Sequence, residues 1–166
     1  ARLADSALHA ARSVTQIGEV RIAQGDLAAA QRSLSEARAL SSDLVGPQPN
    51  HGERLMGLGA IEFWLGNVSW LQGDLATAEE QFRAYLEVAE RLVAIDGANP
   101  EWRMEKSYAH SNLGTVQNAR GDVDGALAEY SSLAKDANGT ELGARALFAQ
   151  AWLLENRLAQ PDTAEA

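Results

Sequence analysis

Few side chains in this sequence have the types and spacing that catalysis or metal binding requires. The histidines are His9, His51 and His110, and they show neither a His-x-x-x-His pattern nor a carboxylate spacing typical of a metal site. His51 lies in a predicted break between regular elements. We interpret His110 as a packed histidine, or one at the rim of a groove, rather than as a ligand. The histidines therefore predict no metal centre.

The other candidates for chemistry also have a structural interpretation. Glu79–Glu80 and Glu87–Glu90 have the pattern of a solvated helix face, not of an acid–base pair. The regularly spaced glycine pairs do not form a phosphate-binding loop, since a predicted helix separates the two glycines of each pair. The chain has no cysteine, which excludes disulfides, thiolate zinc sites and thiol nucleophiles. We therefore expect a protein that is not an enzyme and that needs neither a metal nor a cofactor.

Composition and charge narrow the possible partners. The chain of 166 residues is long enough for one domain, and 31 alanines favour closely packed helices. The net charge of −9 and the lack of a basic stripe argue against nucleic acid, and no apolar run is long enough to insert into a membrane. Residues 51–99 contain eight acidic and three basic residues. We interpret this excess of negative charge either as a solvated helix face or as a surface that attracts a basic partner. A cysteine-free chain suits the cytoplasm or the periplasm, and we favour the cytoplasm.

A repeat of 48 residues organises the chain. Each copy has an apolar residue followed by glycine, a second glycine seven residues later, and an aspartate directly after it. An alanine follows four residues after the aspartate, and a large apolar residue comes four residues after the alanine. The three copies are Ile17-Gly18, Gly25-Asp26, Ala30 and Leu34; Leu65-Gly66, Gly73-Asp74, Ala78 and Phe82; and Leu113-Gly114, Gly121-Asp122, Ala126 and Tyr130.

Each repeated position has a physical role in a helical hairpin. The second glycine ends one helix in the left-handed conformation, and the aspartate caps the start of the next helix. The first glycine lies inside a helix, where glycine costs about 1 kcal/mol relative to alanine, so a close helix crossing must compensate. The missing side chain leaves a notch in the helix surface, which we call the glycine notch. We expect the repeated alanine of the partner helix to pack into it. Each repeat is therefore predicted to be an antiparallel helix pair.

Apolar periodicity and capping residues predict about seven helices and no strand. Asn99-Pro100-Glu101 is typical of a helix start, and so are Asn50…Glu53 and Thr140-Glu141. The fold class is therefore all-α, with a single domain over residues 1–166. Its units span about 1–48, 49–96 and 97–138, with a partial unit at 139–166. The helices are expected at residues 3–24, 27–45, 51–72, 75–96, 100–120, 123–137 and 140–159.

The repeat resembles the tetratricopeptide repeat, which has Leu-Gly in its first helix, Gly-Asp at the turn, and alanine followed by a bulky apolar residue in its second helix. The resemblance implies an α-α superhelix, a right-handed solenoid of antiparallel helix pairs. The period of 48 residues, against about 34 in the family, indicates longer helices. The bulky residue expected three positions before Leu-Gly is replaced by Val14, Glu62 and His110. In the fourth unit, Leu154 replaces the first glycine and Pro161 the second.

The same resemblance implies that the first helix of each pair lines a concave groove that binds peptides. Four positions per unit, spaced by three, four and three residues, share the groove face. They vary between units while the glycine and aspartate positions do not, as expected of a recognition surface. They are Arg12, Thr15, Glu19 and Ile22; Ala60, Phe63, Asn67 and Trp70; Tyr108, Ser111, Thr115 and Asn118; and Phe148, Ala151, Glu155 and Leu158.

Aromatic and amide side chains give this face the composition of a binding site. We expect Phe63, Trp70 and Tyr108 to form an aromatic floor beside Asn67 and Asn118, which can hydrogen-bond an extended peptide. Packing between repeats is the alternative interpretation of Trp70. The tryptophans outside the groove set, which we assign to packing, are Trp64, Trp102 and Trp152.

One groove type in this family binds acidic C-terminal tails through lysines and asparagines. Asn67 and Asn112 occupy matching asparagine positions, but Phe63 stands where the first lysine belongs. Lys106 and His110 are out of register with the other basic positions. We therefore expect no tight binding of an acidic tail.

The sequence supports two functional hypotheses. The first is a scaffold that binds a protein or peptide in the concave groove, as an excerpt of a larger bacterial protein. The second is a structural or oligomerisation module appended to a signalling protein, because the long repeats and the turn Ile95–Pro100 are similar to tandem repeats of bacterial signalling proteins. In that case Trp152, Leu153 and Leu154 would offer an exposed end for self-association.

Overall fold

The hairpin turns of the chain are built by the repeated glycine and aspartate. In the computed structural model, Gly25, Gly73 and Gly121 have φ angles of 77°, 78° and 85°, the left-handed conformation that ends a helix. The aspartate after each glycine accepts a hydrogen bond from the backbone N–H three residues later, at 3.0, 3.1 and 2.9 Å. Both predicted roles are therefore confirmed in all three repeats.

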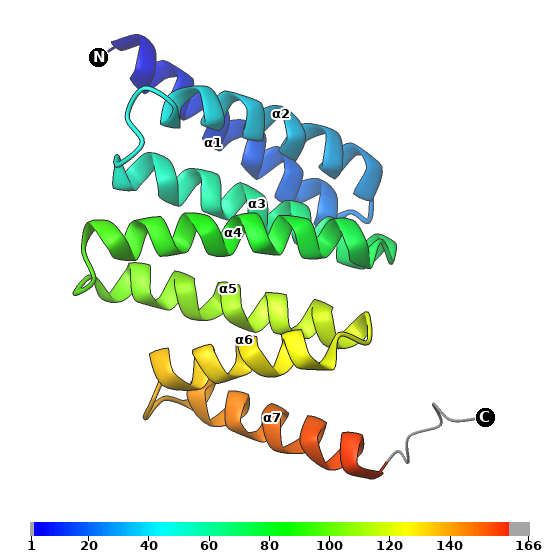
Figure 1. Cartoon of the computed structure of the whole chain (residues 1–166). Helices are drawn as coiled ribbons and strands as arrows, with labels where there is room; N and C mark the ends of the chain where they lie inside the picture. Colours follow the sequence, from blue (N-terminus) through cyan, green and yellow to red (C-terminus); the bar gives the residue numbers. More distant parts are fainter. Residues whose placement is uncertain (1, 160–166) are drawn as a thin grey trace. The chain divides into compact units, whose positions relative to one another are not determined.

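The structure describes residues 2–159, with side chains from residue 6 to residue 157, and this part of the chain contains seven helices and no strand (Figure 1). Every predicted helix is present, and each observed boundary lies within one residue of its prediction. The turn predicted at Ala159-Gln160-Pro161-Asp162 and the side chain of Leu158 lie outside the described residues. The helices are α1 (Arg2–Ala23), α2 (Leu27–Val45), α3 (Gly52–Gln72), α4 (Leu75–Ile95), α5 (Pro100–Ala119), α6 (Val123–Asp136) and α7 (Glu141–Ala159).

The helices form two compact units, the first ending at Ala109 and the second beginning at His110. In the first unit, α1 packs against α2, α2 against α3, and α3 against α4. Successive helices of this unit run antiparallel (Figure 1). In the second unit, α6 packs against α7. This pairwise packing of neighbouring helices confirms the all-α helical repeat.

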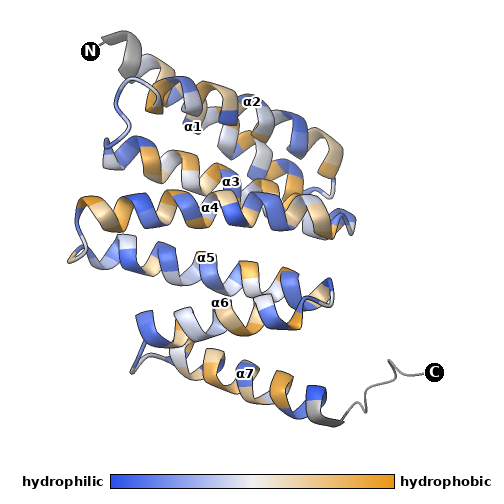
Figure 2. Cartoon of the chain, viewed as in Figure 1, coloured by the Kyte–Doolittle hydropathy of each residue, from blue (hydrophilic) through white to orange (hydrophobic). Residues whose placement is uncertain are grey.

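Each unit has its own apolar core. Ala30, Leu34 and Ala37 on α2 pack against Leu65 and Val68 on α3, and none of these side chains is more than 1% exposed. Figure 2 shows apolar and polar residues interleaved along each helix, which gives every helix a face to bury. No described helix is both long and apolar enough to cross a membrane. The core of the second unit consists of Ala126, Tyr130, Leu133, Ala137, Ala146 and Leu153.

The first glycine of each repeat does mark a close helix crossing, but its partner is not the repeated alanine. A Cβ atom added to Gly66 would lie 2.6 Å from Cε1 of Phe82, which leaves no room for a side chain there. Gly66 lies seven residues before Gly73, whereas Ala78 lies five residues and Phe82 nine residues after it. Side chains in a helix lean toward its N-terminus, and this tilt brings the ring of Phe82 level with Gly66. The equivalent pairs are Gly18–Leu34, Gly66–Phe82 and Gly114–Tyr130.

The predicted helix starts are confirmed at two places and wrong at a third. Asn99 accepts hydrogen bonds from the N–H groups two and three residues later, at 3.0 and 3.3 Å. The Thr140 hydroxyl accepts one from the N–H three residues later, at 3.2 Å. In contrast, α3 does not begin after Asn50: its first residue is Gly52, and the preceding His51 makes no side-chain capping hydrogen bond. Backbone hydrogen bonds from the turn replace the cap there.

Two glycines on α3 allow a matched test of the notch. We expect Gly66→Ala to lower the free energy of unfolding by about 1–3 kcal/mol, because the new methyl group overlaps the ring of Phe82. Gly57→Ala should raise it by about 0.5–1 kcal/mol, because a Cβ there meets no atom within 4 Å and alanine favours the helix. Urea unfolding followed by circular dichroism at 222 nm measures both. Equal effects of the two substitutions would contradict the notch.

Candidate functional site

The aromatic residues predicted for the groove of the first unit are partly used for packing. Phe63 on α3 is half-buried, with its ring centroid 5.0 Å from that of Trp64 and 5.9 Å from that of Tyr85. It also lies 6.5 Å from Phe82, the ring that fills the notch at Gly66. Both α4 partners are buried. Phe63 is therefore held in place by its own hairpin, and only part of its ring faces solvent.

Tyr85 links this cluster to α5. Its hydroxyl donates a hydrogen bond of 2.5 Å to Oε2 of Glu105. Burial, and then this carboxylate, raise the pKa of Tyr85 far above its ordinary value, with a smaller contribution from Tyr108. Tyr108 is 47% exposed. Tyr85 is therefore neutral and buried, and Tyr108 is more accessible than Phe63.

The other groove positions of the first unit differ in their solvent exposure and in whether they form an ion pair. Asn67 and Trp70 are half-buried, and so is Glu19 on α1. Arg12 is exposed, and its Nη2 lies 2.6 Å from Oε1 of Glu53 on α3, an ion pair that ties two first helices together. Exposed pairs of this kind contribute at most about 1 kcal/mol, so a charged ligand can compete for either partner.

Two other residues of the predicted groove set serve the core or the helix itself. Thr15 is only 8% exposed, and its hydroxyl donates to the backbone oxygen of Ala11 at 2.8 Å. Ile22 packs against the core cluster between α2 and α3. Thr15 therefore does not line an open face as expected, and Ile22 uses part of its side chain for core packing.

In the second unit, the predicted positions lie on the C-terminal half of α5. Ser111 and Asn118 are half-buried and Thr115 is exposed. The Thr115 hydroxyl donates to the backbone oxygen of Ser111 at 2.8 Å and lies 3.4 Å from the Tyr130 hydroxyl. Asn118 makes no side-chain hydrogen bond within the described chain, so its amide is available to a ligand.

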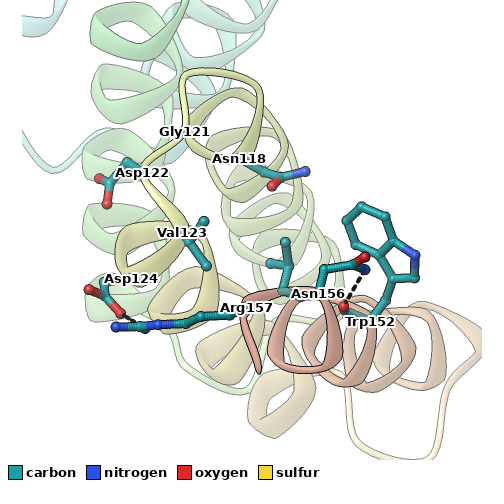
Figure 3. Close-up of a pocket in the computed structure, with 9 residues that line it drawn as sticks. Asn118, Gly121, Asp122, Val123, Asp124, Trp152, Asn156 and Arg157 are labelled. Carbon is teal, nitrogen blue, oxygen red and sulfur yellow. Dashed lines mark hydrogen bonds and ion pairs between the residues drawn. The ribbon is translucent and has the colours of Figure 1, made fainter. Parts of the chain in front are cut away.

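Asn118 opens onto a hollow of about 400 Å³ in the second unit, shown in Figure 3. The hollow lies between the end of α5, the turn into α6 and the C-terminal half of α7. Arg157 on α7 forms an ion pair with Asp124 on α6 at one side of it. The lining residues are Asn118, Gly121, Asp122, Val123, Asp124, Trp152, Leu153, Asn156 and Arg157.

The chemistry of this pocket is that of a binding site. Trp152 is 51% exposed and offers an apolar ring. Asn156 donates its amide hydrogen to the backbone oxygen of Trp152 at 2.7 Å, which leaves its side-chain oxygen as an acceptor. Together with Asn118, the pocket therefore presents donors and acceptors for a peptide backbone beside a surface for an apolar side chain. We call this hollow and its lining residues the α5–α7 pocket.

Asn118, predicted for the groove, and Trp152, predicted to be used for packing, both line this pocket. Trp152 has the same repeat position as Trp64, which packs against the core of the first unit, so assignment to packing followed the repeat. In α7 the assignment is wrong because half of the ring is exposed. The expected exposure of Leu154 is confirmed at 48%, whereas Leu153 is only 4% exposed and belongs to the core of the second unit.

Buried ionisable groups lie apart from the pocket. Glu62 on α3 is 7% exposed, and its Oε2 has no hydrogen-bond partner and lies 3.8 Å from Nη1 of Arg38. Burial raises the pKa of Glu62 above its ordinary value, and Arg38 offsets part of that rise. Glu79, assigned to a solvated face, is also buried, with its Oε1 2.6 Å from Arg83. Glu80 is exposed, as predicted.

His110 is packed, which confirms the interpretation of its sequence position. It is 5% exposed, with Nδ1 at 2.7 Å from Glu129 and Nε2 at 3.9 Å from Asp136, both on α6. None of these three residues lines the pocket. Among the described residues, no three His, Cys, Asp or Glu side chains form a group that could hold a metal ion.

The hairpin geometry has counterparts in known proteins. A family model described as the tetratricopeptide repeat matches two segments, residues 61–84 and 107–130. Each segment contains the notch glycine, the Gly-Asp turn and the bulky residue that covers the notch. The chain matches no curated protein. The resemblance drawn from the sequence is therefore confirmed at the level of the family.

The position of Glu62 predicts a pH-dependent gain in stability on substitution. A carboxyl whose pKa is raised in the folded state makes its full contribution to the stability of the fold below its unfolded pKa, near 4.5. That contribution is lost as the pH rises through the pKa of the folded state. Glu62→Gln removes that loss. We expect its unfolding free energy to match that of the wild type near pH 4 and to exceed it increasingly toward pH 7.

Thermal melts from pH 4 to pH 7.5 measure this difference. Glu80→Gln is the control, because Glu80 is exposed and its substitution should give a difference that does not vary with pH. A constant difference for Glu62→Gln as well would contradict the predicted effect of burial.

Proposed function

The chain belongs to the tetratricopeptide-repeat family, whose repeats generally mediate interactions between proteins, and we propose that it is a non-catalytic scaffold that binds a partner protein as an extended peptide. The α5–α7 pocket carries this proposal. It combines an exposed indole with two asparagine side chains around a hollow of about 400 Å³, a volume within the range of ligand-binding pockets.

The composition of the pocket defines the ligand. Asn118 and Asn156 provide hydrogen bonds for peptide backbone, and Trp152 provides a flat apolar surface for a large side chain. Asp124 and Arg157 form an exposed ion pair at one side of the pocket, and the contacts we propose are those of the indole and the two amides. We infer that the ligand inserts an apolar or aromatic side chain next to Trp152 and pairs its backbone with the two amides.

Peptides selected from a displayed random library against the whole chain test this inference. We expect Trp152→Ala to weaken the binding of the selected peptide by about thirtyfold and Asn118→Ala by about tenfold, as for central contacts of an interface. Leu147→Ala is the matched control, because Leu147 is also exposed on α7 but does not line the pocket. Binding that survives both pocket substitutions would refute the pocket assignment.

The groove positions of the first unit form a separate candidate surface, which is considered by itself. Asn67, Trp70 and Tyr108 each retain exposed surface on first helices. If they contact a ligand, Asn67→Ala and Tyr108→Ala abolish capture of the selected peptide while the melting temperature stays nearly unchanged. Capture that survives both substitutions would contradict the groove assignment.

Acidic tails are not expected to be ligands. The chain has a net charge of −9, and Phe63 is packed against Trp64 and Tyr85 where a lysine would be needed. Calorimetric titration with a short acidic peptide that has a free C-terminal carboxylate should show no binding with a Kd below about 1 µM. Tighter binding would show that the groove supplies cationic contacts by another route.

Self-association is a second candidate function, favoured by the surface of α7. Leu147, Phe148 and Leu154 on this helix are 57%, 74% and 48% exposed. An apolar face of this kind is typical of a surface that pairs with another molecule. Light scattering over a hundredfold range of concentration distinguishes the two functions, because a monomer at every concentration contradicts the oligomerisation module.

A further inference from the structure

The connection between α6 and α7 contains the one Asn-Gly pair of the chain, Asn138-Gly139. Both residues are exposed, and Gly139 has a left-handed φ of 79°. Asparagine before glycine is chemically sensitive, because glycine has no side chain to hinder the attack of its backbone nitrogen on the asparagine side-chain amide. Whether this attack can occur in the folded chain depends on what holds that nitrogen.

The backbone N–H of Gly139 is free to react, unlike the group that follows every other asparagine. It donates no hydrogen bond within the described residues. The N–H after Asn50 donates to the Gln48 backbone oxygen at 3.1 Å, and the nitrogen after Asn99 belongs to a proline. The remaining asparagines lie inside helices, where helix hydrogen bonds hold the N–H groups that follow them: Asn67, Asn112, Asn118 and Asn156.

We propose that Asn138 is a site of spontaneous deamidation and that one product of the reaction loosens the connection between α6 and α7. The Gly139 nitrogen gives its proton to a base in the solvent and forms a bond to Cγ of Asn138. The Cγ–Nδ2 bond then breaks, and ammonia leaves with a proton. The product of this step is a five-membered succinimide ring.

Water then opens the succinimide ring at either of its two carbonyl groups. Opening at Cγ gives aspartate. Opening at the backbone carbonyl of residue 138 gives isoaspartate, in which the main chain runs through the former side chain and is one CH₂ group longer. The whole sequence consumes one water and releases one ammonia, and no atom is oxidised or reduced.

The turn has no room for the longer main chain of isoaspartate. Only Asn138 and Gly139 separate Ala137, the C-cap of α6, from Thr140, the residue before α7. The Ala137 backbone oxygen accepts hydrogen bonds from the Thr140 backbone N–H at 3.1 Å and from its hydroxyl at 2.6 Å. A Cβ atom added to Gly143 would overlap this same oxygen, so α7 begins in close contact with the end of α6. An extra CH₂ group displaces Thr140 from Ala137.

The new negative charge alone should have little effect on this turn. Residue 138 lies two positions after the end of α6, where the helix dipole disfavours an anion, and three positions before α7, where the dipole favours one. Aspartate and isoaspartate carry the same charge, so a difference between them reports the main chain. This proposal does not depend on the function proposed for the α5–α7 pocket.

Ageing of the whole chain at 37 °C and pH 8, followed by peptide mass spectrometry against an unaged sample, tests the modification. We expect Asn138 to lose its amide at least about tenfold faster than any other asparagine, because its neighbouring nitrogen is unhindered and unbonded. Electron-transfer fragmentation distinguishes aspartate from isoaspartate in the product. Asn138→Gln is the matched control, because its longer side chain would need a six-membered ring and should keep its amide.

Hydrogen exchange at the start of α7 tests the consequence. In the aged wild type, the amides of Thr140 and Gly143 should exchange about tenfold faster, because each loses the hydrogen bond that now holds it. The melting temperature should fall by about 2–4 °C. Freshly prepared Asn138→Asp, which has the charge but an ordinary main chain, and aged Asn138→Gln should both behave as the fresh wild type does.

Three results would overturn the proposal. The first is an amide at Asn138 that is lost no faster than those of the other asparagines. The second is conversion to aspartate alone, or an aged chain rich in isoaspartate whose Thr140 and Gly143 amides exchange as in the fresh chain. The third is a fresh Asn138→Asp variant that shows the full effect, because the charge rather than the main chain would then loosen the turn.

Discussion

The hairpins of this protein depend on a bulky side chain of one helix that lies over a glycine of the other. At Gly66 the ring of Phe82 occupies the space where a Cβ atom would be, and Leu34 does the same at Gly18. Glycine inside a helix is unfavourable, so the packing contact must contribute more free energy than the helix loses by having glycine at this position. It does so because the two backbones approach closely enough for the ring to be buried on all sides.

The sequence predicts the elements well because their ends are chemical features. A left-handed glycine, a capping aspartate and an Asn-Pro start each fix a boundary by local hydrogen bonds, which involve only a few neighbouring residues. At α3 the position of the start was predicted to within one residue, but the predicted cap at Asn50 was wrong, because the N-cap residue is His51 and its side chain makes no capping bond. The predicted partner of the notch glycine, the repeated alanine, was wrong because the contact depends on the tilt of side chains toward the N-terminus of their helix. Residue spacing alone does not show this tilt.

The candidate site was harder to predict because exposure depends on neighbours. Trp64 and Trp152 share a repeat position, yet one packs against a core and the other lines an open pocket. The α5–α7 pocket itself forms where the turn before α6 meets α7, a contact between residues that are more than 30 positions apart. Periodicity identifies the face of a helix, but only the packed structure shows whether another helix covers it.

One core position differs between repeats, and it gives each hairpin a separate identity. It holds Val14 in the first repeat, Glu62 in the second and His110 in the third. Glu62 faces Arg38 on the helix before it, whereas His110 faces acidic groups on the helix after it. Segments with near-identical scaffolds are prone to exchange places while they fold, and an exchange here would bury a lone carboxylate or imidazole. The polar side chains at this position thus pair with different neighbouring helices, which disfavours the replacement of one hairpin by another.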